Sequence, residues 1–410
     1  MNLLEGRYVV QDIPLEDIAR EYGTPLYVYD ADKIKSQYAT LTTAFKGLHL
    51  KLKYAVKALT NINILRLMDH YGAGADCVSL NEVLLALKAG FNVNDIIYTP
   101  NCVSFEEIEQ AMEIGVNINI DNLPFLEQFG EKYGHDYPVC IRINPHIVGG
   151  GNRNIQVGHV GSKFGISILQ FEEVRAVVEK YNIYVRGVHS HTGSDILDND
   201  VFLKGARVVF DCARHFKELD FLDFGSGFKV AYQNGDHTTD IPTLGARMTE
   251  AVNEFCAEYG KELEIWFEPG KYLVSESGYF LVNTNLIKES PACTFIGVDS
   301  GFNHLIRPMM YGSHHDIVNI SNPSGEAHLY TVVGNICETD TFGADRKIHE
   351  ARVGDVLAFK NAGAYGFEMS SNFNSRLRPA EVLIYNGEAK LIRERETFDE
   401  LLRNQIEIEL

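Results

Sequence analysis

Two residues whose side chains could do chemistry stand where short apolar runs end. Lys57 follows Tyr54-Ala55-Val56, and Glu268 follows the apolar run 263–267. A lysine amine can hold a carbonyl carbon as a Schiff base, and a buried carboxylate can hold a proton on a ring nitrogen. From its position alone, Lys57 could equally be a lysine at a strand end that extends its ammonium to solvent.

Two further segments could bind a ring and a phosphate. Residues 191–194 read His-Thr-Gly-Ser, and residues 223–227 read Asp-Phe-Gly-Ser-Gly. Gly225 and Gly227 allow close backbone approach and a nest of N–H groups for a phosphate. His191 could lie flat on an aromatic ring while Ser194 contacts the phosphate. Either segment alone is weak evidence for a binding site, because any tight turn after a strand could have the same residues.

The combination of these residues is more specific than any one of them. A Schiff-base lysine, a carboxylate for a pyridine nitrogen, a flat histidine and a phosphate nest together indicate a pyridoxal 5'-phosphate (PLP) site. A zinc site at His189 and His191 is not expected, because no third ligand stands at a suitable spacing. His189 is expected to be a hydrogen-bonded histidine of the core.

The elements that position these residues form a regular alternation. Short strands alternate with amphipathic helices, and a helix follows each of the first seven strands. The strands are expected at 51–59, 74–79, 95–100, 116–121, 138–144, 184–191, 221–227 and 263–270. Eight such units predict a closed parallel (β/α)8 TIM barrel of the α/β class, whose active site lies at the carboxyl ends of the strands. A doubly wound open sheet is the alternative, but no G-x-G-x-x-G follows the first strand.

The pattern changes after residue 270. Strand-like segments separated by Gly, Pro, Asn and Asp continue to about residue 390, without a long amphipathic helix, and predict a mostly β domain of sandwich or barrel type. A strand candidate at 25–30 could return to pair with that domain. We therefore expect an N-terminal segment at 1–30, a PLP-binding barrel at 31–272 and a β domain at 273–410.

Composition excludes several classes of function. The 410 residues carry 37 Lys and Arg against 56 Asp and Glu, and the net charge of −19 opposes binding to nucleic acid or an anionic membrane. No targeting signal and no apolar run of about 18 residues is evident. The seven cysteines are scattered and never spaced C-x-x-C, which favours a reducing cytoplasm over a disulfide framework.

Over nearly its whole length, from Tyr22–Asp30 to Arg378–Val382, the chain resembles the fold-type III PLP-dependent decarboxylases. Residues 54–59 match a YAVKAN-like motif, which implies that Lys57 holds the cofactor. Residues 191–194 match H-x-G-S, which implies ring stacking by His191 and phosphate contact by Ser194. The family's glycine turn matches Gly225 to Gly227. Residues 268–271 match EPGR, so Glu268 should face the pyridine nitrogen. The cofactor site is expected to include also Asp76, Gly270 and Lys271.

The β domain also carries family segments. The segment 299–312 implies that Arg307 and Tyr311 hold a distal substrate carboxylate. Cys337 and Glu338 resemble a CES motif, which implies a cysteine proton donor and a glutamate for a distal ammonium, both entering the partner subunit's site in a homodimer. Residues 363–367 match the segment whose tyrosine, here Tyr365, reaches the cofactor phosphate. Tyr365 and Lys271 are also expected on the substrate side.

Three positions depart from the family pattern. Lys271 replaces the arginine of EPGR, keeping the charge but losing the bidentate fork. Leu59 replaces the asparagine of YAVKAN. The acid of C-E-S-G-D is displaced by one residue, to Asp340. None of these changes removes a catalytic group.

The resemblance implies a reaction on a small amino acid. Because Arg307, Tyr311 and Glu338 suit an end with both a carboxylate and an ammonium, the expected reaction converts meso-2,6-diaminopimelate to L-lysine and CO2. Alternatives are a decarboxylase of carboxynorspermidine, ornithine or arginine, an amino acid racemase, which Glu268 disfavours, and a catalytically dead homologue.

Two loops carry expectations of their own. The connection 146–162 is long and lies on the catalytic face, so it is expected to act as a lid. His314 and His315 are expected in a solvated turn.

Overall fold

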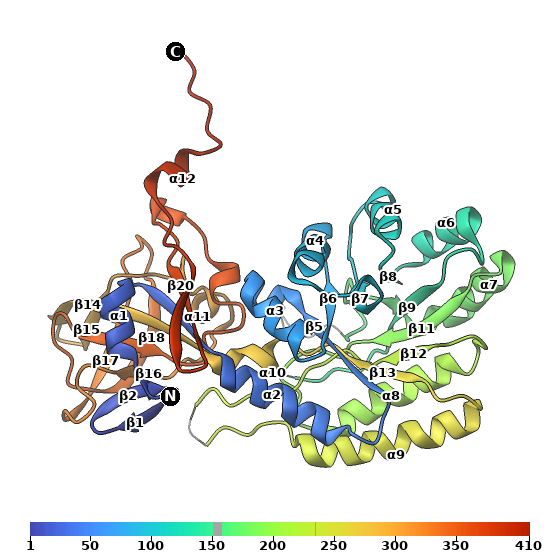
Figure 1. Ribbon diagram of the computed structural model, residues 1–410, viewed down its shortest axis with the longest axis horizontal. Helices are drawn as coiled ribbons and strands as arrows, with labels where there is room; N and C mark the ends of the chain where they lie inside the picture. Colours follow the sequence, from blue (N-terminus) through green and yellow to red (C-terminus); the bar gives the residue numbers. More distant parts are fainter. Residues whose placement is uncertain (151–157, 234) are drawn as a thin grey trace. The chain divides into compact units, whose positions relative to one another are not determined.

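The computed structural model describes residues 1–150, 158–233 and 235–410 and divides the chain into two compact units. The barrel unit comprises residues 36–231 and 237–272, and the β unit comprises residues 1–35, 232–236 and 273–410 (Figure 1). Residues 31–35 and 232–236 thus belong to the β unit, although they lie within the barrel range that the sequence predicts. Part of the expected lid, residues 151–157, lies outside the described residues.

Within the described residues, eight parallel strands close into a barrel, as predicted, and the open-sheet alternative is wrong. Each strand pairs with the next, and β13 pairs with β5, while the short β10 (Ile166–Ser167) adds to β9. The strands are β5 (Leu50–Ala55), β6 (Gly74–Cys77), β7 (Ile96–Tyr98), β8 (Asn117–Ile120), β9 (Val139–Asn144), β11 (Val185–Ser190), β12 (Phe221–Asp223) and β13 (Glu264–Phe267).

The helices of the barrel begin and end where local chemistry favours it. The Ser104 hydroxyl caps its helix by accepting from the Glu107 N–H, and Gly115 ends that helix in the left-handed region. Figure 1 shows the helices on the outside of the strands. They are α2 (Ala31–Ala44), α3 (Ile62–His70), α4 (Leu80–Ala89), α5 (Phe105–Ile114), α6 (Leu123–Tyr133), α7 (Phe171–Tyr181), α8 (Asn199–Ala213) and α9 (Ile241–Tyr259).

The barrel interior is apolar at its centre. Ile97, Cys140, Phe221 and Trp266 form a buried cluster, with the Phe221 and Trp266 rings stacked. Because alternate residues of a strand share a face, the inward positions next toward the carboxyl ends of two of these strands are Asp223 and Glu268. The apolar cluster therefore supports a polar layer at the end of the barrel where active sites lie.

The β unit is built around the N-terminal strand β4 (Leu26–Asp30). This strand pairs antiparallel with β14 (Gly278–Glu289) and parallel with β20 (Ala380–Tyr385), so the predicted return of the N-terminal strand is confirmed. The sheet order is β18-β17-β15-β14-β4-β20-β21, with β19 on β14 and β16 on β19. The remaining strands are β15 (Thr294–Val298), β16 (Ile317–Asn319), β17 (Ala327–Val333), β18 (Thr341–His349), β19 (Val356–Phe359) and β21 (Glu388–Arg393).

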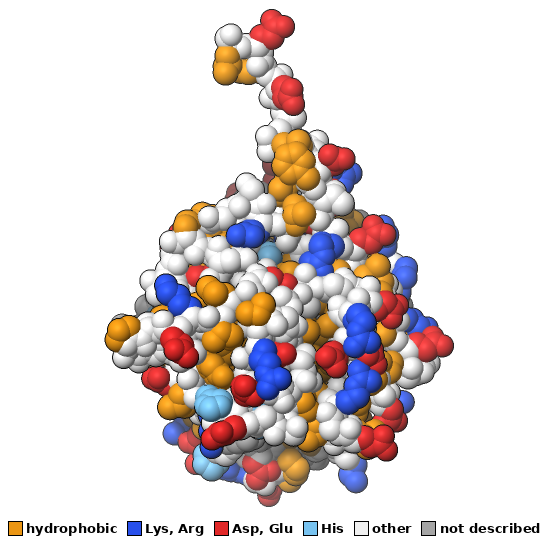
Figure 2. Space-filling view, turned by 90° about the vertical axis from the view of Figure 1, so that its left-hand side faces the viewer, with side chains coloured by type: hydrophobic (Ala, Val, Ile, Leu, Met, Phe, Trp, Pro, Cys, Tyr) orange, Lys and Arg blue, Asp and Glu red, His pale blue; other side chains and the backbone are white. Residues whose placement is uncertain are grey.

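Short elements complete the β unit. Strands β1 (Asn2–Leu4), β2 (Arg7–Val10) and β3 (Ile13–Pro14) form a small sheet before α1 (Leu15–Tyr22), and the short helices are α11 (Arg307–Tyr311) and α12 (Phe398–Leu402). The short helix α10 (Lys271–Val274) begins in the barrel unit and ends in the β unit. Figure 2 shows acidic and basic side chains interspersed over one face, without a large field of one sign. Among the described residues, no helix is both long and apolar enough to span a membrane.

Protonation of His304 should destabilise the β unit in acid. His304 is buried with Nδ1 3.0 Å from the Ser300 hydroxyl, and burial lowers the pKa of His304 to about 4, against 6.5 for an ordinary histidine. Between these values the unfolded chain binds a proton that the folded chain does not. The free energy of unfolding therefore decreases as the pH is lowered through this window, by up to about 1.4 kcal/mol per pH unit. Urea unfolding at a series of pH values measures the slope. His304→Gln should reduce it, and an unchanged slope would contradict the prediction.

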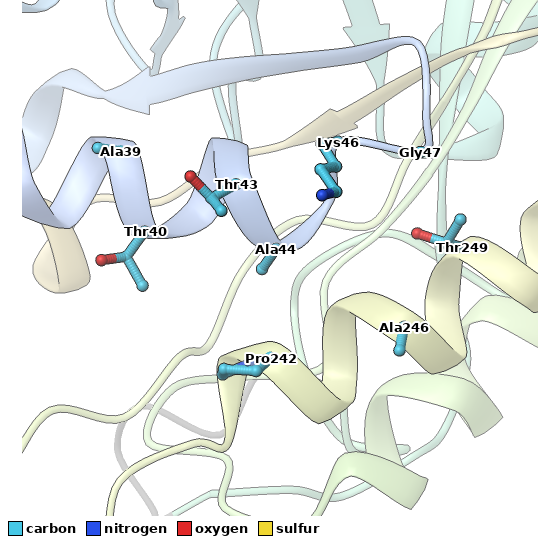
Figure 3. A pocket seen from close by; sticks show the side chains of 9 residues that line it. All are labelled: Ala39, Thr40, Thr43, Ala44, Lys46, Gly47, Pro242, Ala246 and Thr249. Carbon is cyan, nitrogen blue, oxygen red and sulfur yellow. The ribbon is translucent and has the colours of Figure 1, made fainter.

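A groove of about 700 Å³ lies between α2 and α9 on the barrel unit. Figure 3 shows Thr43 and Ala44 on one side of it and Pro242 and Ala246 on the other. Its lining is made of small side chains plus Lys46, and it contains none of the predicted site residues. The groove therefore lacks the carboxylate, histidine and glycine turn that the predicted chemistry needs beside a lysine.

Candidate active site

Lys57 lies in a tight turn rather than in the strand that the sequence predicts. Strand β5 ends at Ala55, and Lys57 occupies the 3₁₀ turn η1 (Val56–Ala58) between two buried residues. Its half-exposed ammonium lies 2.6 Å from Asp76 Oδ2 on the neighbouring strand β6. Burial and the charge of Glu268 raise the pKa of Asp76, and Lys57 opposes them. The turn thus presents an amine at the strand end with a buried acid as its partner.

Glu268 is a buried carboxylate held beside a histidine. It follows β13, its backbone N–H donates to the Gly225 carbonyl, and its Oε2 lies 3.2 Å from His189 Nε2. His189 is fully buried with Nδ1 2.8 Å from the Asn119 amide nitrogen, so the expectation of a core histidine is confirmed. Burial alone would raise the pKa of Glu268, but the neighbouring His189 and the charge of Lys57 hold it below its usual range. Glu268 is therefore ionised.

The glycine turn after β12 fixes the ring of His191. Gly225 has φ +61°, and a Cβ there would lie 2.5 Å from His191 Nδ1. The Ser226 N–H donates to the same nitrogen over 3.1 Å. Burial and the charge of Arg142 lower the pKa of His191 to about 3, so its ring is neutral near pH 7. The structure thus provides a flat, uncharged ring directly over the glycine turn.

The segment that carries Ser194 is joined to the same turn. Gly227 has φ +126°, and a Cβ there would lie 2.6 Å from the Gly193 carbonyl oxygen. The Ile196 N–H donates to the Gly227 carbonyl over 2.8 Å. Only a residue without a side chain fits this approach. The two segments expected to bind phosphate therefore lie together.

The substituted lysine has a partner that sequence reasoning missed. Lys271 Nζ lies 2.6 Å from Asp195 Oδ1, and both side chains are largely buried. The preceding Gly270 packs closely, since a Cβ there would lie 3.0 Å from that of Ala55. The only sequence signal for this pair is an acid directly after Ser194. Lys271 thus forms an ion pair with an aspartate.

The polar layer of the barrel unit can hold a polar ligand. Among the described residues, several buried atoms here have no hydrogen-bond partner: Asp76 Oδ1, Asn119 Oδ1 and Glu268 Oε1. Buried polar groups normally have partners, so such a group of free atoms indicates a binding site. A half-exposed amine, an ionised carboxylate, a neutral histidine ring and a backbone nest fit the aldehyde, ring nitrogen, ring face and phosphate of PLP.

In the β unit, Arg307 is a buried guanidinium with unused donors. It begins α11, is 5 % exposed, and its Nε and Nη1 have no hydrogen-bond partner among the described residues. The guanidinium lies 5.3 Å from the centre of the Tyr232 ring. Tyr311 ends the same short helix. A buried cation of this kind is suited to binding an anion such as a carboxylate.

Cys337 and Glu338 lie exposed between β17 and β18. The Cys337 sulfur is 3.4 Å from Glu338 Oε2 and 3.5 Å from the Asn374 amide nitrogen. The displaced acid Asp340 has a structural role, because its carboxylate accepts from the Phe302 and Ile336 N–H groups. The displaced acid thus serves the fold, while Cys337 and Glu338 are exposed.

Tyr365 and His315 are two further residues of the β unit for which the sequence makes a prediction. Tyr365 is half-buried in the loop after β19, with φ +56°. The expectation of a solvated turn at 314–315 is wrong for His315. Its side chain is 1 % exposed, and its Nδ1–H donates to the Lys360 carbonyl over 2.8 Å.

Comparison with known proteins agrees with this geometry. The family model of the pyridoxal-dependent decarboxylase pyridoxal binding domain matches residues 31–275. The diaminopimelate decarboxylase of Methanothermobacter thermautotrophicus is 38% identical over 98% of this chain and 96% of that protein, and the Escherichia coli enzyme is 33% identical over 95% and 96%.

Solved structures give the same result. The diaminopimelate decarboxylase of Helicobacter pylori, crystallised with L-lysine, superposes with a TM-score of 0.87 at 32% identity, covering 95% of this chain and 98% of that one. The M. jannaschii enzyme has a TM-score of 0.91 at 30% identity, covering 99% and 98%. With its barrel, its lysine turn and its buried glutamate, the chain belongs to the diaminopimelate decarboxylase family of pyridoxal-dependent decarboxylases.

Proposed function

We propose that this protein is a PLP-dependent carboxy-lyase that converts meso-2,6-diaminopimelate to L-lysine and CO2, the last step of lysine biosynthesis. The observation that carries the proposal is the buried, ionised Glu268 in the same strand-end layer as the half-exposed amine of Lys57. Bound PLP supplies an electron sink for the pair left on Cα when CO2 departs. Racemases of this barrel type usually pair the pyridine nitrogen with arginine, so the glutamate favours decarboxylation.

The residues of the barrel unit would hold the cofactor. Lys57 would hold its aldehyde carbon and then release the product, and Glu268 would keep a proton on the ring nitrogen. His191 would cover the ring face, and the backbone N–H groups between Gly225 and Gly227, with Ser194, would bind the phosphate. The remaining cofactor contacts are assigned to Asp76, Gly270 and Lys271, and to Tyr365 of the β unit.

The residues of the β unit would read the distal end of the substrate. The free donors of Arg307 support its assignment, with Tyr311, to the distal carboxylate. Glu338 would bind the distal ammonium, and Cys337 would protonate Cα. We propose that these two act in the partner subunit's site, so that the active form is a homodimer. Lys271 and Tyr365 are further substrate contacts, and the pairing of Lys271 with Asp195 limits the charge that Lys271 can offer to a carboxylate.

We also propose a cytoplasmic location. All seven cysteines lie within the described residues and all are free thiols. Free cysteines in this number are typical of a reducing compartment.

The experiment that tests the function is CO2 release from a panel of substrates by the purified protein with added PLP. The panel contains meso-diaminopimelate, L-lysine, L-ornithine, L-arginine and carboxynorspermidine. We expect release from diaminopimelate alone, with L-lysine formed in equal amount. Release from another member would keep the cofactor assignment and overturn the assignment of Arg307, Tyr311 and Glu338.

Cys337→Ala should slow turnover more than it weakens cofactor binding. The thiol is exposed and contacts Glu338 and Asn374, so its removal leaves no cavity and no unpaired charge in the fold. Loss of an acid–base group typically costs about 10²- to 10⁴-fold in rate. Steady-state kcat and PLP titration on the same preparation check this, with Cys102→Ala, an exposed thiol of the barrel unit, as the control. An equal loss in both measurements would indicate a structural role instead.

A further inference from the structure

Asp223 and Glu268 bring two buried carboxyl groups close together. Asp223 ends β12, is fully buried, and its Oδ1 accepts from the Gly225 N–H over 2.8 Å. Within residues 1–150, 158–233 and 235–410, its Oδ2 has no hydrogen-bond partner, and neither has Glu268 Oε1. A carboxyl oxygen of one residue lies within 4.8 Å of a carboxyl oxygen of the other. Two ionised carboxylates at this distance in a buried site repel strongly, so one of the two should carry a proton.

The surroundings decide which carboxyl group carries that proton. Glu268 Oε2 has His189 Nε2 at 3.2 Å, and His189 Nδ1 faces the Asn119 amide nitrogen, which can only donate, so we assign the ring proton to Nε2. Asp223 has no salt bridge in the part of the chain that the structure describes, and Lys53, near it on the barrel interior, lies against Asp95. Burial and the charge of Glu268, with a smaller effect of Asp76, raise the pKa of Asp223 well above its usual range. The proton therefore belongs on Asp223.

We infer that Asp223 is a positioning residue that remains a neutral acid and donates its proton in a hydrogen bond to Glu268, which keeps Glu268 an anion directed at the cofactor's ring nitrogen. A carboxylate accepts about four hydrogen bonds, so Glu268 can accept from His189, from Asp223 and from a protonated pyridine together. The inference rests on the proposed function for the cofactor, but the protonation of Asp223 is a property of this chain alone.

Two substitutions of Asp223 distinguish a protonated, neutral side chain at this position from an ionised one. Asp223→Asn keeps an acceptor for the Gly225 N–H and an N–H donor for Glu268, so kcat should stay within about threefold of wild type. Asp223→Ala removes the donor, and kcat should fall about 10- to 100-fold. Because Glu268 then loses a hydrogen bond to its ionised form, its pKa rises, and the acid limb of the kcat profile should move to higher pH. An Asp223→Asn variant as impaired as Asp223→Ala would overturn the inference.

Infrared difference spectroscopy tests the same proton without the reaction. The wild-type spectrum minus that of Asp223→Asn, recorded on the protein without PLP, should contain the carbonyl stretch of a protonated carboxylic acid. Glu381 is the matched control. It is equally buried but bonded to the guanidinium of Arg393 and the hydroxyl of Tyr29, so Glu381→Gln should remove carboxylate bands only. This measurement also decides the matter if Asp223→Ala does not fold.

Three results of these experiments have distinct meanings. Carboxylate bands in the Asp223 difference spectrum would overturn the inference. So would one divalent ion per chain that a chelator removes together with the acid band, because His189, Asp223 and Glu268 would then be metal ligands. An acid band in a protein that releases no CO2 from the panel would support the protonation of Asp223 and contradict the proposed function.

Discussion

Replacing Lys57 with alanine should abolish both turnover and covalent attachment of the cofactor. Lys57 is the half-exposed amine of the strand-end layer, held against Asp76 at 2.6 Å in a turn whose other side chains are buried. Because the same amine would hold the cofactor and release the product, its loss removes both functions, and kcat should fall by about 10³-fold or more. Borohydride reduction followed by peptide mass spectrometry should place the cofactor on Lys57 in the wild type and on no lysine in the variant.

Two companion variants make this prediction specific. Lys57→Arg keeps a cation beside Asp76, so it should fold normally while still failing to attach the cofactor. Lys88→Ala, at an exposed position on α4, should behave as the wild type. The assignment fails if the reduced cofactor is found on another lysine, or if Lys57→Ala still forms the adduct.

Replacing Arg307 with methionine should damage substrate binding without destabilising the protein. The buried guanidinium has two nitrogens with no hydrogen-bond partner in the described part of the chain, so binding a carboxylate there forms charge-assisted hydrogen bonds that methionine cannot form. Their loss should cost about 2–4 kcal/mol, which raises KM for diaminopimelate by about 30- to 1000-fold. The melting temperature without substrate should not fall, because a buried guanidinium with two unsatisfied donors costs the fold about as much as its contact with the Tyr232 ring contributes. Steady-state kinetics and thermal unfolding give the two readouts.

Arg378, which also lies in the β unit, differs from Arg307 because its guanidinium is hydrogen-bonded within the fold. Its guanidinium donates to the Ser370 hydroxyl and the Phe367 carbonyl and lies 4.3 Å from the centre of the Phe367 ring. Arg378→Met should therefore lower the melting temperature and leave KM nearly unchanged. If Arg307→Met behaves like Arg378→Met, then Arg307 serves the fold and does not bind the substrate.

The barrel could be predicted from the sequence because its signal is local and repeated. Each strand is a short apolar run followed by a helix with its own caps, such as Ser104 and Gly115, and these patterns need no knowledge of distant residues. Residues at strand ends could likewise be predicted to meet, since all parallel strands of a barrel end at the same face. The resemblance to a known family then assigned roles to these residues.

The partnerships within the site could not be predicted in the same way. Asp195 contacts Lys271, and Asn119 contacts His189, across 76 and 70 positions of sequence. Asp223 was visible only as the start of a glycine turn, because its burial beside Glu268 depends on how β12 and β13 pair. The burial of His315 depends in turn on its hydrogen bond to the carbonyl of Lys360, which directly follows strand β19. Such contacts follow from tertiary structure, which local patterns do not encode.

The position of β4 has a consequence for synthesis of the chain. One neighbour of this strand, β14, begins at residue 278, and the other, β20, ends at residue 385. Strand β4 is therefore synthesised before the barrel unit and lacks both neighbours while the whole barrel unit is being made. Unpaired strand edges are prone to association with other chains. Strand β4 thus depends on β14 and β20 for its protection, and premature termination before β20 would leave a complete barrel with one edge of β4 unpaired.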